Sequence, residues 1–207
     1  GDEGPNTGGM GAYSPAPGVT DEIHQRIMNE VIVPTVEGMA SEGHPYTGFL
    51  YAGLMIDAQG TPKVIEYNCR FGDPETQPMM LRLKSDLVEL VEAANREELD
   101  KTTIEFDPRA AVGVVLAAKG YPGDYPKGDA ISGLKVNYPA DEKVFHAGTK
   151  QDGENVVTAG GRVLCATALG NTVTEAQQRA YELVKQISWE GMEYRTDIAY
   201  RAIAREQ

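Results

Sequence analysis

Long apolar stretches are missing from this chain of 207 residues. Its longest apolar runs, at residues 49–56 and 110–118, fall well short of the roughly 20 residues that a membrane-spanning helix needs. The opening residues, GDEGP at 1–5, also lack the basic and apolar regions of a signal peptide. We therefore expect no membrane span and no membrane partner.

Cysteine is scarce, and an initiator methionine is absent. The two cysteines, Cys69 and Cys165, both lie in apolar segments and are too few to form a disulfide scaffold. A reducing compartment fits this usage best, so we expect a cytoplasmic protein. Because the chain begins at Gly1 and has no targeting sequence, we expect its N-terminus to be a cut inside a longer polypeptide.

Basic residues are outnumbered by acidic ones, 19 against 31, which gives a formal net charge of −12. Such a charge repels the phosphates of nucleic acids, and no basic patch offsets it, so we expect no nucleic-acid partner. Residues 1–105 hold 18 acidic and 7 basic residues, whereas residues 106–207 hold 13 and 12. The acidic first part suits binding of metal cations, but it has few of the positive groups that a nucleoside triphosphate requires.

The remaining composition is that of a globular protein, with 41% apolar and 24% charged residues. The length allows two domains, and we place them at residues 1–105 and 106–207, with an acidic connection at 97–107. The fold class that we predict is α+β.

The first domain should open with a loop or linker, because residues 1–18 are rich in glycine and proline. Thr20 is then a candidate N-cap for a helix that Pro34 kinks or restarts and that Gly43 ends. Residues 46–57 and 63–71 read as the two strands of an antiparallel hairpin. A further helix should be capped by Ser85. Its predicted core-facing residues are Leu87, Leu90, Val91 and Ala94.

The second domain should consist of short strands and one clear helix. Strands are indicated at residues 111–118, 143–146 and 162–169. The helix should begin at a capping box formed by Thr174 and Gln177. Its predicted apolar face consists of Ala176, Ala180, Leu183, Val184 and Ile187.

Chemistry is indicated on the second strand of the hairpin. Since side chains alternate along a strand, Glu66, Asn68 and Arg70 should share one face, and Ile65, Tyr67, Cys69 and Phe71 should pack on the other. A carboxylate and an amide oxygen two residues apart can share a hard cation such as Mg²⁺. The alternative is a solvated strand face with a cross-strand ion pair.

A glycine-rich loop is the second candidate. Residues 4–11, GPNTGGMG, would let backbone N–H groups approach an anion, with side-chain donors from Asn6 and Thr7. The alternative is a flexible loop without a ligand. The loop matches neither the P-loop nor the dinucleotide-binding pattern.

Three strings together resemble the phosphoribosylamine-glycine ligase family, also called glycinamide ribonucleotide synthetases, which are ATP-grasp enzymes of purine synthesis. They are GPNTGGMGAY at 4–13, GFLYAGLMID at 48–57 and EYNCRFGDPETQ at 66–77. The resemblance continues through residues 113–125, 144–150 and 160–170, so it covers essentially the whole chain. It implies that residues 1–105 are the C-terminal half of an ATP-grasp domain and that a small C-terminal domain follows.

The resemblance also implies an activity and a site. The expected substrates are glycine, 5-phosphoribosylamine and ATP, and glycyl phosphate is the expected intermediate. Glu66 and Asn68 match the family's ligands for Mg²⁺ or Mn²⁺ and so would bind the nucleotide through the metal. Arg70 and Asp73 would be catalytic. The implied substrate-binding residues are Asn6, Thr7, Gly8, Gly9, Gly11, Arg70, Asp73, Pro74, Glu75 and Thr76.

Two departures accompany the resemblance. Many ATP-grasp enzymes place a further acidic ligand on the preceding strand, where this chain has Leu54, Met55 and Ile56. The family's N-terminal domain and lysine-bearing half of the ATP-grasp fold are also missing, so we expect this piece alone to be inactive and the missing half to be its partner. Two alternatives remain, namely another ATP-grasp ligase or carboxylase and a non-catalytic interaction module.

Overall fold

The computed structural model describes residues 1, 3–135 and 137–206, and it contains two compact units that do not follow the order of the chain. We call them the sheet unit and the hairpin unit. The sheet unit consists of Gly1–Pro15, Asp73–Leu83 and Phe106–Gln207, and the hairpin unit of Ala16–Gly72 and Lys84–Glu105. The chain passes from the hairpin unit back to the sheet unit between residues 105 and 106, the position of the predicted domain boundary. The division into the two domains of the family stays a prediction. Two earlier segments, however, pack with the C-terminal part.

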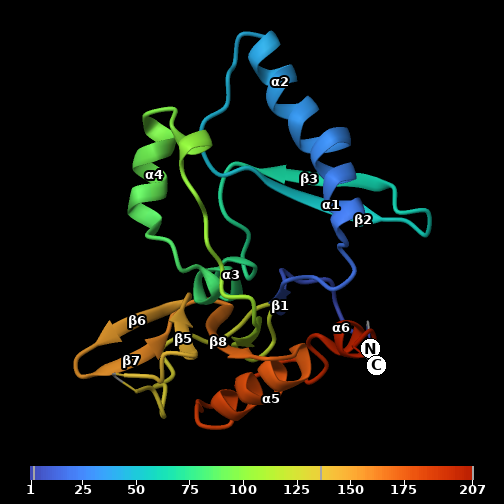
Figure 1. Cartoon of the computed structure of the whole chain (residues 1–207). Helices are drawn as coiled ribbons and strands as arrows, with labels where there is room; N and C mark the ends of the chain where they lie inside the picture. Colours follow the sequence, from blue (N-terminus) through green and yellow to red (C-terminus); the bar gives the residue numbers. More distant parts are fainter. Residues whose placement is uncertain (2, 136, 207) are drawn as a thin grey trace. The chain divides into compact units, whose positions relative to one another are not determined.

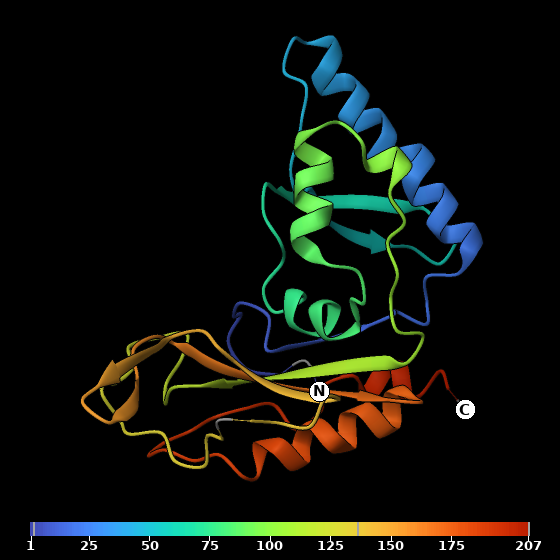
Figure 2. The ribbon, with the colours of Figure 1, turned by 60° about the vertical axis from the view of Figure 1, so that its left-hand side comes forward.

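The sheet unit is built on a four-stranded antiparallel sheet in the order β1-β4-β8-β5. The bounds are β1 Gly11–Ser14, β4 Ala110–Ala117, β5 Glu142–His146 and β8 Arg162–Gly170. Helix α5 (Val173–Val184) covers one face and helix α3 (Thr76–Arg82) the other, as Figures 1 and 2 show. The remaining elements are the small hairpin of β6 (Thr149–Asp152) and β7 (Asn155–Thr158), and the short helix α6 (Tyr200–Ile203).

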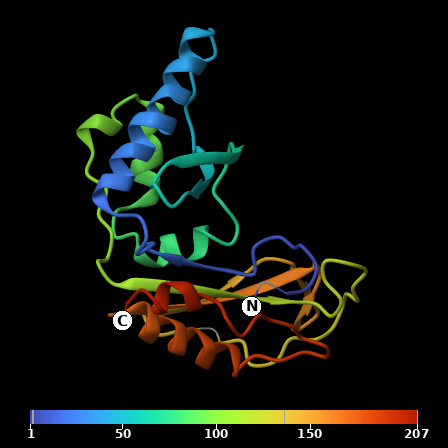
Figure 3. The ribbon, with the colours of Figure 1, turned by 90° about the vertical axis from the view of Figure 1, so that its right-hand side faces the viewer.

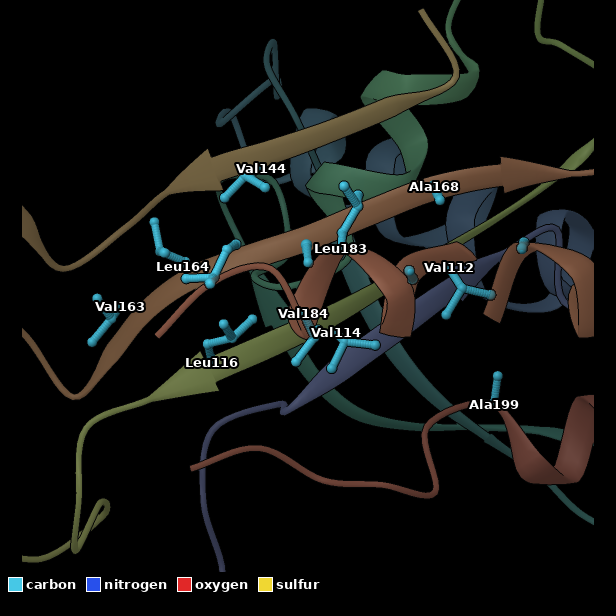
Figure 4. Packing of buried hydrophobic residues seen from close by; sticks show 14 of the residues in the cluster. Val112, Val114, Leu116, Val144, Val163, Leu164, Ala168, Leu183, Val184 and Ala199 are labelled. Carbon is cyan, nitrogen blue, oxygen red and sulfur yellow. The ribbon is translucent and has the colours of Figure 1, made fainter. Parts of the chain in front are cut away.

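The core of this unit lies between the sheet and α5. Figure 4 shows Val112, Val114 and Leu116 of β4 close to Leu183 and Val184 of α5. All five are fully buried. The three residues of β4 share one face of the sheet because side chains alternate along a strand. The other face of β4 carries Ala111, Gly113 and Val115. A Cβ atom at Gly113 would lie 3.0 Å from Sγ of Cys165 and 3.3 Å from Oγ1 of Thr167 on β8, so the missing side chain leaves room for these two neighbours.

The hairpin unit pairs β2 (Tyr51–Ile56) with β3 (Pro62–Asn68), which confirms the predicted antiparallel hairpin. A long helical segment precedes the hairpin in the chain and consists of α1 (Asp21–Ile27), the π-helical turn η1 (Met28–Ile32) and α2 (Val33–Ser41), as Figure 3 shows. The guanidinium of Arg26 donates to the carbonyl of Gln59 at 3.0 Å. Helix α4 (Leu87–Asn95) and the 3₁₀ turn η2 (Leu99–Lys101) complete the unit.

The predicted signals of the first helix are confirmed. The hydroxyl of Thr20 accepts a hydrogen bond from the backbone N–H of Ile23. Pro34 is the second residue of α2, directly after the π-helical turn, and its missing N–H explains the change in hydrogen bonding at this point. Gly43 follows the helix with a φ of 83°, a conformation that glycine adopts without strain.

Two predicted helix starts are wrong by one or two residues. The cap of α4 is Asp86, which accepts from the N–H groups of Val88 and Glu89, because Ser85 instead bonds to Glu105. The cap of α5 is Thr172, which accepts from Glu175. The hydroxyl of Thr174 donates to Glu206 instead, and Gln177 donates to the carbonyl of Ile198.

Other expectations need correction as well. The loop predicted at 1–18 contains the edge strand β1, and α3, α6, β6 and β7 were not predicted. The apolar face of β3 is not core, because Ile65 is 65% and Tyr67 41% exposed. Val91 of α4 is also exposed, at 38%. A two-stranded ribbon has no second layer of its own to bury both faces, and most exposed large apolar residues belong to the hairpin unit.

No helix formed by the described residues combines the length and apolar composition that a bilayer crossing demands.

Candidate active site

The predicted metal ligands both lie on β3. Glu66 pairs with Gly53 across the hairpin, and Asn68 pairs with Tyr51. A side chain at Gly53 would come within 3.1 Å of Cγ of Glu66, so glycine leaves room for the glutamate. Within the described part of the chain, neither Glu66 nor Asn68 makes a side-chain hydrogen bond or ion pair. Their oxygens are therefore free to bind a cation.

This donor set suits magnesium or manganese, because both are hard cations that accept carboxylate and amide oxygens together with water and phosphate. No group of three or more His, Cys, Asp or Glu side chains with metal-binding geometry occurs among the residues described. Two protein ligands are sufficient where a nucleotide supplies the others. The third acidic ligand stays unassigned, as the sequence of β2 already indicated.

The strand ends sooner than predicted. β3 stops at Asn68, and Cys69 and Arg70 form a bend. The shared strand face therefore does not extend to Arg70, whose guanidinium donates to the carbonyl of Phe71 at 2.8 Å. Phe71 stacks on Phe49 with ring centroids 3.9 Å apart. This contact, inside the hairpin unit, fixes the backbone just before the chain passes to Asp73.

The glycine-rich loop borders a hollow of the sheet unit with a volume of about 440 Å³. Its lining consists of residues 3–11, Arg195 and Ile198. All predicted loop residues, namely Asn6, Thr7, Gly8, Gly9 and Gly11, belong to this lining. The loop therefore forms part of an open, polar concavity.

Two of the loop glycines make close contacts that a side chain would prevent. A Cβ atom at Gly9 would lie 2.5 Å from Cδ of Pro74, and one at Gly8 would lie 3.0 Å from the hydroxyl of Tyr121. The N–H of Gly8 donates to that same hydroxyl at 3.2 Å. The structure thus brings the glycine-rich loop against the turn at Asp73 and Pro74.

The carboxylate of Asp73 is held at both oxygens. Oδ2 forms an ion pair with Arg162 at 2.9 Å, and Oδ1 accepts from Nε2 of Gln77 at 3.0 Å. Pro74 is buried, Glu75 precedes α3, and Thr76 is the first residue of that helix. The side chain of Asp73 is still 46% exposed, so a ligand can reach it.

The structure groups the predicted site residues in two sets. The glycine-rich loop and residues 73–76 belong to the sheet unit, whereas Glu66, Asn68 and Arg70 belong to the hairpin unit. Sequence reasoning missed Arg162, Tyr121 and Arg195. An arginine at the head of the apolar strand β8 was the only local signal for Arg162.

Arg195 pairs with Asp197 through two hydrogen bonds of 2.9 and 3.1 Å, and it also donates to the carbonyl of Glu3. These bonds from Arg195 hold the pKa of Asp197 well below its usual range. Arg195 lines the hollow, and Asp197 lines a second hollow that also contains Arg195, so the pair adds polar groups without much net charge.

Two other candidates are less informative. His146 is exposed, and its Nδ1 lies 3.0 Å from the hydroxyl of Thr149. Cys165 is buried in β8, and burial raises the pKa of its thiol to about 12. Since a thiolate is the reactive form, Cys165 is a core residue.

Comparison with known proteins gives two family models that match the chain. Residues 1–76 match the phosphoribosylglycinamide synthetase ATP-grasp (A) domain, and residues 111–201 match the phosphoribosylglycinamide synthetase C domain. The two matched ranges include every predicted site residue.

Curated relatives agree with these models. Phosphoribosylamine–glycine ligase of Vibrio parahaemolyticus is 72% identical over 206 residues, and the Escherichia coli enzyme of the same name is 69% identical over 207. Each alignment covers 100% of this chain and 48% of the relative. The chain thus spans about half the length of the curated relatives it matches.

Solved structures support the fold. Phosphoribosylamine–glycine ligase of Thermotoga maritima matches with a TM-score of 0.80 and 39% identity, over 96% of this chain and 48% of that one. The urea carboxylase of Kluyveromyces lactis matches at 18% identity with a TM-score of 0.64, over 94% of this chain and 17% of that one, which indicates a shared fold alone. With both of its domain models and its α+β architecture present, this chain belongs to the phosphoribosylglycinamide synthetase family.

Proposed function

We propose that this chain is the C-terminal half of an ATP-dependent ligase that joins glycine to 5-phosphoribosylamine in de novo purine biosynthesis. The products would be glycinamide ribonucleotide, ADP and phosphate. The observation that carries the proposal is the 72% identity, over the full chain, to a relative with the name phosphoribosylamine–glycine ligase. The two family models support it independently.

The reaction has two steps. A carboxylate oxygen of glycine attacks the γ-phosphorus of ATP, and ADP leaves, which gives glycyl phosphate. The amine nitrogen of 5-phosphoribosylamine then attacks the acyl carbon, a proton is lost and phosphate leaves. Catalysis of this kind depends on positioning and electrostatics, so it needs no nucleophilic side chain.

Glu66 and Asn68 would hold Mg²⁺ or Mn²⁺ and so bind the nucleotide. When bound, such an ion neutralises negative charge on the transferring phosphate group. Their placement two residues apart on β3 and the absence of competing side-chain partners in the described structure support this role.

The glycine-rich loop and the turn at residues 73–76 would bind the two acceptor substrates. Asp73 would accept hydrogen bonds from a substrate amine, since its carboxylate is oriented yet exposed. The hollow of the sheet unit would be lined by Asn6, Thr7 and the backbone of Gly8, Gly9 and Gly11. Arg70 would contribute the positive charge that a carboxylate or phosphate needs.

The partner that we propose is the first half of the same polypeptide. It would supply the positive groups that bind ATP phosphates, which are scarce in residues 1–105. The coverage of 48% of the relatives supports this proposal. The two unpaired cysteines fit a reducing location, and we place the enzyme in the cytoplasm.

Two other functions remain as alternatives. A different ATP-grasp ligase or carboxylase would share the fold, and a non-catalytic module would share the sequence without the activity. The string at residues 68–73 favours glycine as the acid.

The test is a full-length chimaera in which this chain replaces the matching half of the Vibrio parahaemolyticus relative. ADP release would be measured with glycine, with other amino acids and with bicarbonate, each with and without 5-phosphoribosylamine. We expect ADP release that depends on glycine and 5-phosphoribosylamine together. Release with another acid would favour a different ligase, and no release with any acid would favour the non-catalytic module. This chain alone should be inactive.

A further inference from the structure

Three segments that are far apart in the sequence meet at one arginine in the sheet unit. Nη1 of Arg162 donates to the carbonyl of Gly9 at 3.0 Å and to that of Asp73 at 2.7 Å. Nη2 pairs with the carboxylate of Asp73 at 2.9 Å. One guanidinium therefore binds the glycine-rich loop and the turn that carries the candidate catalytic carboxylate.

The guanidinium also sets how close the loop can lie. A side chain at Gly8 would come within 3.1 Å of Cζ of Arg162. The neighbouring Tyr121 accepts from the N–H of Gly8 on the same side. The backbone of Gly8 and Gly9 thus packs directly against the side chains of Arg162, Tyr121 and Pro74. Because both residues are glycines, they contribute no side chain of their own to this contact.

Arg162 itself stands on a rigid support. It is the first residue of β8, whose next eight residues are buried. A side chain at the preceding Gly161 would lie 2.3 Å from the ring of Tyr121, so the backbone before the strand is tightly packed. The side chain of Arg162 is only 23% exposed. Groups held by rigid strands are positioned more accurately than groups on free loops.

The chemistry of these contacts indicates that Arg162 positions the segments of the candidate site and does more than stabilise the fold. An arginine fork can serve several fixed acceptors in one plane, which an ammonium on a flexible stem cannot reproduce. Its partners here are two backbone carbonyls and one carboxylate, and all three belong to segments of the candidate site. Gln77 fixes the second oxygen of Asp73, so the orientation of the carboxylate is fully determined.

We propose that Arg162 is a positioning residue for the acceptor substrates: it holds Asp73 and the loop at Gly8 and Gly9 in the arrangement that binds glycine and 5-phosphoribosylamine. The inference rests on the proposed function. It predicts that loss of Arg162 affects the acceptors and spares ATP, because the metal-binding pair Glu66 and Asn68 belongs to the hairpin unit.

The experiment uses the full-length chimaera with Arg162→Met and Arg162→Lys. Arg179→Met is the matched control, because Arg179 is 30% exposed, donates to the carbonyl of Leu169 and pairs with Glu142, all outside the candidate site. Steady-state kinetics would vary glycine, 5-phosphoribosylamine and ATP in turn, and thermal unfolding would be followed for every variant.

For Arg162→Met we expect kcat/KM for glycine and 5-phosphoribosylamine to fall roughly 100-fold, the scale of a misplaced reacting group. The KM for ATP should stay within about twofold of its original value, and Arg162→Lys should recover little. In an Asp73→Asn background the further loss should be much smaller, since residues that act through one another are not additive.

Unchanged acceptor kinetics in Arg162→Met would overturn the inference. An equal loss of acceptor kcat/KM in Arg162→Met and Arg179→Met that follows thermal stability would also overturn it, because that pattern would mean that Arg162 only stabilises the fold. A parent chimaera without glycine-dependent ADP release would instead refute the proposed function, and the two failures are therefore distinguishable.

Discussion

Nη2 of Arg162 lies 2.9 Å from Oδ2 of Asp73, although 89 positions separate the two residues in the chain. The contact joins the head of β8 to the turn before α3 within the sheet unit. A candidate catalytic carboxylate is therefore oriented by the C-terminal part of the chain. The fold thus connects a part of the chain without predicted site residues to the candidate site.

Removal of the proposed metal ligands should separate activity from stability. Glu66→Ala or Asn68→Ala in the full-length chimaera should raise the Mg²⁺ concentration needed for half-maximal activity by at least about tenfold, since loss of even an outer partner costs roughly 10- to 100-fold. The melting temperature should not change, because neither side chain has a partner in the described structure. Activity titrated with Mg²⁺ and Mn²⁺ is the measurement. An unaltered metal requirement in both variants would refute the assignment.

A methyl group at Gly9 should displace the glycine-rich loop. The added Cβ atom would lie 2.5 Å from Cδ of Pro74, and Pro74 is buried and cannot yield. We expect Gly9→Ala to lower kcat/KM for the acceptor substrates by about tenfold or more. The control is Gly38→Ala in α2, where the added atom meets nothing within 4 Å. That variant should keep its activity and gain about 0.5–1 kcal/mol of stability. Equal activity of both variants would contradict the role of the loop.

The corrected N-cap of α5 gives a prediction about stability. Thr172→Ala removes the acceptor for the N–H of Glu175 and should lower the free energy of unfolding by about 1 kcal/mol. Thr174→Ala should cost less, because its hydroxyl bonds only to the side chain of Glu206. Urea unfolding of the two variants decides between them. A larger loss of unfolding free energy for Thr174→Ala would instead support Thr174 as the N-cap, as the sequence predicted.

The arginine network at the end of the sheet should make stability depend on pH. Hydrogen bonds from Arg109 hold the pKa of Asp141 below its ordinary value, which is about 3.9 in an unfolded chain. The native state thus favours the ionised carboxylate. The resulting stabilisation is present above about pH 4 and is lost as the pH falls through the lower native pKa.

Asp141→Asn should therefore destabilise the protein by about 1 kcal/mol near neutral pH, the scale of a partly exposed ion pair. The difference from the parent should shrink below about pH 4. Chemical unfolding at a series of pH values is the measurement, and the exposed Asp152→Asn serves as control, since Asp152 has no side-chain partner in the described structure. A difference that stays constant down to the lowest pH would contradict this explanation.

Local sequence signals worked where the physical cause is local. The hairpin, the cap at Thr20 and the buried strands β4 and β8 were predicted, because caps, turns and runs of apolar residues act over a few positions. Local signals failed where two neighbouring polar residues can each serve as the N-cap of the same helix. Ser85 and Asp86 can both cap α4, and the bond of Ser85 to Glu105, which comes from a distant segment, decides between them.

The sequence alone determined the family, the α+β class and the pair Glu66 and Asn68 on one strand, because strings of residues and the two-residue period of a strand are visible without coordinates. Tertiary structure decided that Arg162 binds Asp73 and Gly9, and that residues 1–15 and 73–83 pack with the C-terminal part. These contacts join segments far apart in the chain, and their geometry depends on how the sheet folds as a whole.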